Sequence, residues 1–345
     1  MNIVINFVGD IGLFKSYELQ GIDPTKEIKL PNADYNIGNL EFIGHFRDLK
    51  GAFFDVQDHY FPSIDYLNTS RLERFHYLSL ANNHIVDFGA DGVRRNIKIL
   101  ESKSIKYFGY GCKREFNFEV IERNNIRIAL IGCVGNGRWS KKNNDGCGPD
   151  NYDIERLNDF IKRERRKYNH IIIYMHWGSE LVDIPSPRDI KNAHQLIDSG
   201  ASAIIGAHSH IIQGIECYNH GIIAYGLGSF IYRPNEELGY IKDKKREFSI
   251  CLNLNFNENA IVSYKAYYYL LDNKDVPRLL INPSKRELRY FLRLNKNFNN
   301  AIQHHLKKYI TLLFRETYSL LLRFIINPRA AANHYILYLK DKISL

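Results

Sequence analysis

The sequence predicts an α/β protein, because short apolar strand-like runs alternate along the chain with helical patterns. Six runs rich in Ile, Val, Leu and Tyr predict buried strands, at residues 3–8, 77–80, 126–134, 170–175, 203–205 and 222–225. Three segments between them carry apolar residues three and four positions apart, as helices do, at residues 89–102, 151–168 and 188–199. This alternation favours sheets that are covered by helices.

The residue pattern of the carboxyl-terminal third changes at two points. Residues 251–271 alternate in polarity and are rich in aromatic side chains, which predicts closing antiparallel strands. Beyond Asn282 and Pro283 the composition becomes basic and aromatic, with apolar residues at spacings that keep one helical face apolar. We therefore expect one domain over residues 1–272 and a basic, aromatic, amphipathic helical extension over residues 283–345.

The net charge of +9 is carried by this extension. From Lys285 to the end there are 12 Lys and Arg residues against 3 Asp and Glu. Subtracting them from the 47 and 38 of the whole chain leaves 35 of each sign in the main body. A protein that binds nucleic acid over its whole surface would not be neutral there, so no nucleic-acid partner is expected.

The cysteines and the amino-terminal segment favour a cytoplasmic location. The five cysteines are odd in number and scattered without a C-x-x-C spacing, which favours a reducing compartment. The chain enters a predicted strand at once and reaches Gly9 and Asp10, so we expect no signal peptide. No uncharged apolar run approaches the ~20 residues that span a bilayer, so we expect no transmembrane helix.

Side chains that bind metals recur directly after the predicted strands. Asp10 follows the first, Asn83 and His84 follow residues 77–80, and His176 follows residues 170–175. Residues 203–205 are followed by Gly206-Ala207-His208-Ser209-His210, which places two imidazoles two positions apart on a loop. Because the carboxyl ends of strands in open α/β sheets meet in one crevice, we expect these side chains to converge. Neutral imidazole is a common ligand of transition metals.

Each of these positions alone also has an ordinary structural explanation. Asn82-Asn83-His84 fits a helix-entry turn, Asp10 fits a plain turn, and Glu41 fits a surface carboxylate. Their combination is more specific, because two divalent cations held ~3.5–4 Å apart need a shared carboxylate and neutral ligands. A mixture of that kind is present in Asp10, Glu41, Asn83, His176, His208 and His210.

A series of motifs in one order extends this pattern over residues 1–270. It comprises Gly9-Asp10, Asn39-Leu40-Glu41, Ala81-Asn82-Asn83-His84 with Asp87-Phe88-Gly89, His176-Trp177-Gly178, Gly206-Ala207-His208-Ser209-His210 and Tyr225-Gly226-Leu227-Gly228-Ser229-Phe230. The series resembles the CapA, or poly-γ-glutamate capsule synthesis, family, which is similar to the calcineurin-like metallophosphoesterases. The resemblance implies a four-layer α/β/β/α sandwich of the metallophosphoesterase type.

The resemblance also implies one or two divalent metal ions, such as Mn, Fe, Zn or Mg, and a role for each residue of the motifs. Asp10 and His210 would bind one ion, Asn83, His176 and His208 the other, and Glu41 would bridge them. His84 would act on the leaving group, because the free pKa of histidine lies near neutrality. Asp87 would orient this ring or cap the next helix. The expected substrate contacts are Asn39, Asn82, Trp177 and Ser229, although a large aromatic residue such as Trp177 beside a crevice is more often part of its wall.

Two departures from the pattern bear on this expectation. The phosphoesterases begin with Asp-x-His, whereas Ile11 and Gly12 follow Asp10, so the first metal position has one ligand fewer. Ser229 stands where the family usually has Asn, which places a smaller hydrogen-bonding group beside the site.

The expected function is hydrolysis of a phosphoester or related polar bond in capsule or envelope polymer biosynthesis, with an anionic small molecule or polymer as substrate. Two alternatives stay open. One is a non-hydrolytic accessory subunit of a poly-γ-glutamate synthesis complex, and the other is a metal-dependent amide hydrolase acting on a γ-glutamyl polymer. The extension from residue 285 either docks on the sandwich or a second copy of it, or lies peripherally on an anionic membrane surface at its inner face.

Overall fold

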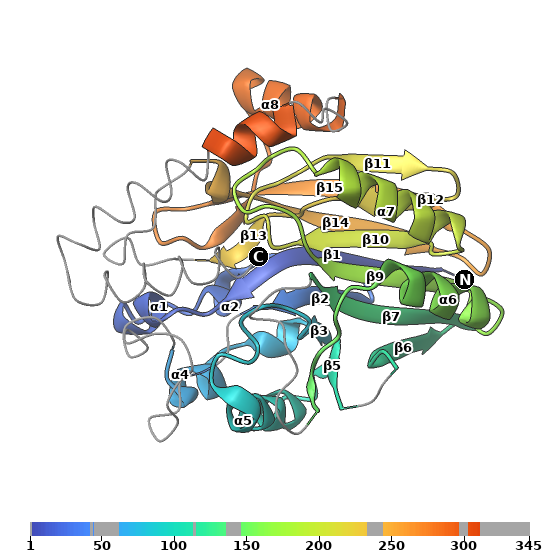
Figure 1. The fold of residues 1–345 in the computed structure, drawn as a ribbon. Helices are drawn as coiled ribbons and strands as arrows, with labels where there is room; N and C mark the ends of the chain where they lie inside the picture. The colour runs from blue at the N-terminus through green and yellow to red at the C-terminus, as the bar shows by residue number, and fades with distance from the viewer. Residues whose placement is uncertain are drawn as a thin grey trace.

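The computed structural model describes residues 2–41, 44, 62–112, 115–135, 146–232, 244–296 and 303–310. Within these ranges two large sheets lie face to face, with α4 and α5 at one edge of the view and α8 at the opposite edge (Figure 1). The strand-like runs predicted from the sequence are present, and the predicted helix at residues 89–102 is α5 (Gly89–Ser102).

The first sheet is built around β1 (Ile3–Gly12), which is buried almost throughout. On one side of β1 the strands are parallel and run in the order β2, β3 and β4; on the other side antiparallel strands follow in the order β14, β15 and β16. A short parallel strand, β13, also pairs with β1. Their bounds are β2 (Tyr35–Leu40), β3 (Tyr77–Ser79), β4 (Lys106–Phe108), β13 (Ser229–Tyr232), β14 (Phe248–Phe256), β15 (Ile261–Leu271) and β16 (Pro277–Leu279).

The second sheet has the order β11-β12-β10-β9-β7-β6, with parallel pairing from β12 to β7 and antiparallel edge strands. Its central strands are continuous apolar runs, as expected for parallel strands that are covered on both faces. Their bounds are β6 (Phe118–Arg123), β7 (Ile126–Val134), β9 (His170–His176), β10 (Ala203–Ala207), β11 (Ile215–Tyr218) and β12 (Gly221–Ala224). A separate two-stranded ribbon joins β5 (Tyr110–Gly111) to β8 (Gly148–Pro149).

Three apolar clusters define four layers. One lies between the sheets and contains Phe7 of β1 together with Tyr174 of β9. A second lies between the first sheet and its helices, and a third between the second sheet and α6 and α7. The predicted four-layer α/β/β/α sandwich is therefore confirmed. The helices are α1 (Lys15–Leu19), α2 (Pro24–Glu27), α4 (Ile64–Thr69), α5, α6 (Ile154–Glu164), α7 (Pro187–Asp198), α8 (Lys285–Lys296) and the short 3-10 helices η1 (Leu72–Arg74) and η4 (Lys244–Glu247).

Helix starts in the second half follow from their capping residues. The Asp153 carboxylate accepts hydrogen bonds from the first backbone amides of α6, and the Ser186 hydroxyl does the same for α7, where Pro187 occupies the first turn. These side chains satisfy amides that have no partner inside the helix. The predicted helix at residues 151–168 is too long at both ends, whereas the one at residues 188–199 agrees with α7 to within one residue at each end.

Cys112 and Cys147 form a disulfide that ties the β5–β8 ribbon together. The scattered spacing of the cysteines did not indicate this pair. The inference of a reducing compartment loses its support, since disulfides persist mainly in oxidising compartments. Among the described residues Cys133, Cys217 and Cys251 are free thiols. No helix in the described ranges is long and apolar enough to cross a membrane.

The first sheet extends past the predicted domain end at residue 272, because β16 pairs with β15 as its edge strand. Of the expected extension over residues 283–345, the structure describes α8 and the helical residues 303–310. The other residues of the extension lie outside the described ranges.

Candidate metal centre

The metal-type residues predicted from separate strands converge at the carboxyl ends of both sheets. Asp10 lies within β1 and Glu41 follows β2, while His176 ends β9. Close backbone packing allows this meeting: a Cβ atom on Gly9 would lie 1.8 Å from the Gly228 carbonyl oxygen, so only glycine fits where β1 passes that segment. The amide of Asp10 donates to the same oxygen at 3.2 Å.

Glu41, His208 and His210 offer ligand atoms that all lie within 4.8 Å of one another. The Glu41 side chain is fully buried, and neither of its carboxylate oxygens has a hydrogen-bond partner in the described part of the chain. Burial, reinforced by the nearby Asp10 charge, raises the pKa of Glu41 well above its ordinary value. A buried carboxylate without hydrogen bonds is costly unless a cation neutralises it, so this donor set fits a metal ion.

A second group of ligand atoms gathers around His176. Oδ1 of Asn83 lies 2.7 Å from Nε2 of His176, which lies 3.1 Å from Nδ1 of His208. Burial lowers the pKa of His176 well below its ordinary value and that of His208 to about 4. Both rings are therefore neutral at physiological pH, which is the form that binds metals.

Glu41 lies between the two groups. Its Oε1 atom is 3.7 Å from Nε2 of His176 and 3.6 Å from Nε2 of His210. Asp10 completes the other end, because its Oδ2 atom lies 3.3 Å from Nδ1 of His210 and accepts the backbone amide of His208 at 3.1 Å. All six predicted metal-type residues are thus brought together in one place.

The loop that carries His208 and His210 has an unusual backbone. Their φ angles are 85° and 57°, in the left-handed region that residues with a Cβ atom seldom adopt. Between them, the carbonyl of Ser209 accepts the amide of Leu181 at 2.8 Å, which fixes the loop to the segment after β9. Such strained positions persist where surrounding contacts determine them, and they concentrate at functional sites.

His84 lies beside this cluster with 22% of its side chain exposed. Its Nδ1 atom is 2.8 Å from Oδ2 of Asp87, and its backbone amide donates to Oδ1 of Asn82 at 3.1 Å. Burial alone would lower the pKa of His84, but the charge and hydrogen bond of Asp87 outweigh it and raise that pKa above its ordinary value. Asp87 therefore holds this ring and favours its protonated form.

Comparison with known proteins places the chain in a family. Residues 5–234, two thirds of the chain and the whole cluster just described, match the bacterial capsule synthesis protein family PGA_cap. The chain belongs to this family. The Capsule biosynthesis protein CapA of Bacillus anthracis is 31% identical over 211 residues, and the PGA biosynthesis protein CapA of Bacillus subtilis is 28% identical over 243 residues.

These alignments cover 59% and 66% of this chain, which spans 51% and 62% of the two relatives. The chain thus accounts for little more than half of their length. A phosphatase structure from Mycoplasma pneumoniae is 12% identical, with a TM-score of 0.47 over 84% of this chain and 97% of that one.

Four residues of this PGA_cap chain that were expected to contact substrate are buried against the site's own components. Asn39 donates to Oδ1 of Asp10 at 2.9 Å, and Asn82 donates to the Leu40 carbonyl at 2.8 Å. Ser229 lies 3.1 Å from Nδ1 of His210. Trp177 is 4% exposed, packs in the core outside the second sheet and donates to the Tyr225 carbonyl. Tertiary packing thus turns these four side chains toward the ligands and the strands, and their contact with substrate stays a prediction.

The sequence motifs do not include Glu180, whose charge contributes to the raised pKa of Glu41 and of His84. The same charge opposes the lowering of the His208 pKa by burial. Glu180 lies half-buried in the turn after β9, four residues beyond His176. Its place shortly after a strand that ends in a ligand was the available signal. Arg246 of η4 was also missed; it is buried, and its positive charge acts on Glu41 in the opposite sense.

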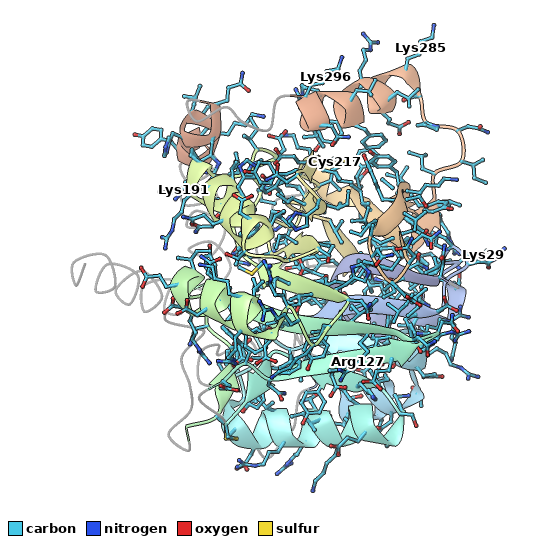
Figure 2. All side chains as sticks on the ribbon, turned by 90° about the vertical axis from the view of Figure 1, so that its right-hand side faces the viewer. Lys29, Arg127, Lys191, Cys217, Lys285 and Lys296 are labelled. Carbon is cyan, nitrogen blue, oxygen red and sulfur yellow. A yellow bond between two sulfur atoms is a disulfide. The ribbon has the colours of Figure 1, made fainter. Side chains whose placement is uncertain are left out.

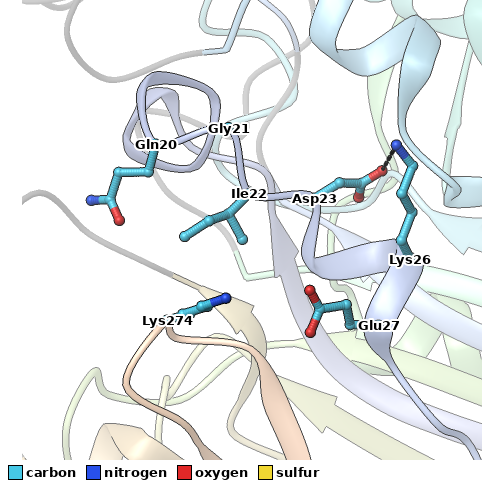
Figure 3. A pocket seen from close by; sticks show the side chains of 7 residues that line it. All are labelled: Gln20, Gly21, Ile22, Asp23, Lys26, Glu27 and Lys274. Carbon is cyan, nitrogen blue, oxygen red and sulfur yellow. Dashed lines mark ion pairs between the residues drawn. The ribbon is translucent and has the colours of Figure 1, made fainter.

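A surface hollow of about 410 Å³ lies elsewhere on the molecule. Figure 3 shows its walls, formed by the α1–α2 connection on one side and Lys274 on the other. Asp23 and Lys26 form an ion pair there at 3.6 Å. None of the clustered metal-type residues lines this hollow, which is therefore separate from the candidate metal centre.

Proposed function

We propose that the protein is a metal-dependent hydrolase of a phosphoester or related polar bond in capsule polymer biosynthesis. The observation that supports this most is the buried Glu41 carboxylate, whose Oε1 atom lies 3.7 Å from the imidazole of His176 and 3.6 Å from that of His210, and which has no hydrogen bond in the described part of the chain. Asp10 and His210 would hold one ion, and Asn83, His176 and His208 the other. Ions bound there would supply Lewis-acid polarisation of the scissile group and of the attacking water.

The chain's own residues supply the remaining chemistry. His84, with its pKa raised by Asp87, carries a proton at a pH where an unperturbed histidine has begun to lose it. A protonated imidazole at the partly exposed edge of the cluster can donate that proton to a leaving oxygen. Asn39 and Asn82 hold Asp10 and Leu40 in place, so the ligand atoms are positioned before a metal binds.

One observation favours a second candidate function, that of a non-hydrolytic accessory subunit. Ile11 and Gly12 follow Asp10, and the Ile11 side chain is buried in the core beside the first sheet. No imidazole can therefore come from these two positions, and the group formed by Asp10 and His210 is smaller than its neighbour. A site that binds one ion firmly and the second weakly would serve for holding an anionic chain without cleaving it.

Metal analysis combined with a substrate panel tests both functions. Purified wild type, His208→Ala and His84→Ala would be assayed for bound metal and for hydrolysis of phosphomonoesters, phosphodiesters and γ-glutamyl peptides. His220→Ala is the matched control, since His220 is exposed in the β11–β12 turn away from the cluster. We expect His208→Ala to lose metal and activity, and His84→Ala to keep metal but lose about 10²–10⁴-fold in rate.

The outcomes separate the hypotheses. Wild-type protein without metal after supplementation would contradict the metal centre itself. Metal binding that depends on His208 without turnover of any substrate would favour the accessory function. Turnover confined to γ-glutamyl peptides would make the protein an amide hydrolase.

A further inference from the structure

The two described helices of the carboxyl-terminal segment pack on the body with one face only. Phe291 of α8 stacks on Tyr268 of β15, with ring centroids 3.9 Å apart and planes 13° from parallel. Phe291 and Leu294 are buried, and Oδ1 of Asn295 accepts the backbone amide of Ile215 at 2.9 Å. The inner face of α8 is thus fixed to both sheets.

A buried carboxylate fixes both helices in orientation. Asp183, in the turn after β9, has a fully buried side chain that pairs with Arg293 of α8 at 3.3 Å, with Lys245 at 3.3 Å and with Lys307 of the second helix. Nδ1 of His304 lies 2.8 Å from the carbonyl of Ile184, in the same turn. Because these contacts come from one side, they determine which faces of the helices point outward.

The outward faces keep large apolar side chains in spite of this docking. On α8, Leu288 and Leu292 are 45% and 57% exposed and lie one turn apart. On residues 303–310, Leu306, Tyr309 and Ile310 are 57%, 64% and 43% exposed, at the i, i+3 and i+4 spacing of one face. Docking on the sandwich therefore accounts for only part of the apolar surface of these helices.

Cations surround these apolar side chains. Besides Arg293, which pairs with Asp183, the exposed residues of α8 include four basic ones, Lys285, Arg286, Arg289 and Lys296, whereas Glu287 is its one acidic residue. Figure 2 shows Lys285 and Lys296 at the two ends of α8, at the outer edge of the molecule. The exposed Lys308 adds positive charge on the second helix, whose Lys307 pairs with Asp183.

We propose that this outer surface of α8 and residues 303–310 binds an anionic phospholipid membrane, with both helices lying in the plane of the interface. Basic residues around an exposed apolar stripe match a surface that is anionic outside and apolar beneath. A soluble polyanion would pair with the cations but would leave the leucines in water, so membrane binding explains more of the surface.

The same contacts connect the membrane surface to the metal centre. The turn that holds Asp183 also provides the Leu181 amide to the Ser209 carbonyl, between His208 and His210. In addition, the Gln213 side chain donates to the Val182 carbonyl at 2.6 Å. A membrane bound to the helices therefore holds the centre in a fixed orientation. Membrane binding itself does not depend on the hydrolase function proposed above.

Vesicle flotation of the full chain tests the proposal. Wild type would be floated with vesicles of phosphatidylcholine alone and of phosphatidylcholine mixed with phosphatidylglycerol, at low and high salt. We expect binding to the mixed vesicles that weakens at high salt. The variant Leu288→Glu with Leu292→Glu should bind the mixed vesicles with an affinity that is lower by at least about tenfold. The reason is that two carboxylates replace side chains that enter the apolar layer.

Two further variants keep the test decisive. Leu19→Glu is the matched control, since Leu19 is 74% exposed on α1, outside this surface, and its flotation should equal that of wild type. Lys285→Glu with Lys296→Glu, at exposed positions, should also reduce flotation. This variant replaces the leucine variant in the test if the leucine variant proves unstable on heating. Binding of soluble poly-γ-glutamate and the molecular mass in solution would be measured for wild type and for each variant.

The proposal would be overturned by wild-type protein that stays with the pellet, or that floats equally with uncharged vesicles. Flotation of the leucine variant equal to wild type would likewise overturn it. So would a dimer that is lost in the leucine variant, since the surface would then be a contact between two copies. Binding of poly-γ-glutamate that the lysine variant loses, with no flotation of wild type, would assign the surface to a polyanion.

Discussion

Oδ1 of Asn83 lies 2.7 Å from Nε2 of His176, although 93 positions separate the two residues in the chain. One follows a strand of the first sheet and the other ends a strand of the second, so the contact joins the carboxyl ends of both sheets. An amide oxygen and a neutral imidazole nitrogen at this distance have lone pairs that can be directed to a common point. The sandwich thus assembles a ligand set that neither sheet contains alone.

Replacing Glu41 with Gln should abolish metal binding and stabilise the metal-free protein. The raised pKa of Glu41 means that the folded state retains a proton which the unfolded state releases above its ordinary value near 4.5. The stability of the metal-free wild type should therefore fall as pH rises above that value, whereas Glu41→Gln lacks this penalty. We expect a gain of about 1–3 kcal/mol at neutral pH.

Thermal unfolding in a chelator between pH 4.5 and 7.5 measures this effect, with bound metal determined separately. Glu258→Gln, at an exposed position, is the control and should behave like wild type. A Glu41→Gln protein that keeps its metal would show that this carboxylate is not a ligand.

Replacing Asp87 with Asn should move the pH profile of catalysis. The Asp87 charge raises the pKa of His84, so removing it lowers that pKa and deprotonates the ring at a lower pH. Since a general acid must be protonated, the alkaline limb of kcat should shift to lower pH, with a loss of about 10–100-fold near neutrality. Bound metal should stay unchanged. An unshifted profile with reduced activity would give Asp87 a purely structural role.

Replacing Asp183 with Asn should loosen the carboxyl-terminal helices. Three cations face this buried carboxylate, and its pKa is lowered because their hydrogen bonds and charges outweigh its burial. Removing the charge leaves these partly exposed cations without their common partner, at a cost of about 1–3 kcal/mol because water can hydrate them. Urea unfolding and limited proteolysis with mapped cleavage sites would measure it. Asp198→Asn, at an exposed position, is the control and should change neither the urea unfolding nor the cleavage pattern. Equal cleavage of the two variants would contradict the role of Asp183.

Removing the disulfide should lower stability without affecting the metal centre. The bond links residues 35 positions apart, and a loop of that length is worth at most about 4 kcal/mol through the entropy of the unfolded chain. Cys112→Ser with Cys147→Ser should unfold at a lower temperature than wild type under non-reducing conditions. Without a reductant, an alkylating reagent should label the folded wild type at the exposed Cys217, while Cys133 and Cys251 stay protected by burial. Labelling of Cys112 would show that the bond is absent.

The sequence was informative where one local pattern determines an element. The apolar run of β7 and the helical spacing of α5 predicted their bounds to the residue. β2 escaped prediction because Tyr-Asn-Ile-Gly-Asn-Leu contains residues that are rare in strands. It becomes a strand through its position between β1 and β3, which supply its backbone partners.

The candidate site also has features that the sequence could predict and features that it could not. Metal-type residues could be predicted because each follows a strand, and topology alone brings strand ends together. The direction of the side chains around them could not, since Asn39 and Ser229 turn inward only because Asp10 and His210 offer them partners. The Cys112–Cys147 pair was missed for a similar reason, because pairing depends on the approach of β5 to β8 and not on spacing in the sequence.

The left-handed backbone at His208 and His210 provides metal-type side chains at a cost in the thermal stability of the fold. Glycine adopts such angles freely, whereas a residue with a Cβ atom does so at about 1–2 kcal/mol. Random libraries screened for thermostability alone should therefore enrich glycine at both positions and discard the metal. Libraries screened with metal present should retain histidine there. Protein engineers who stabilise this scaffold would consequently do best to leave these two positions out of the search.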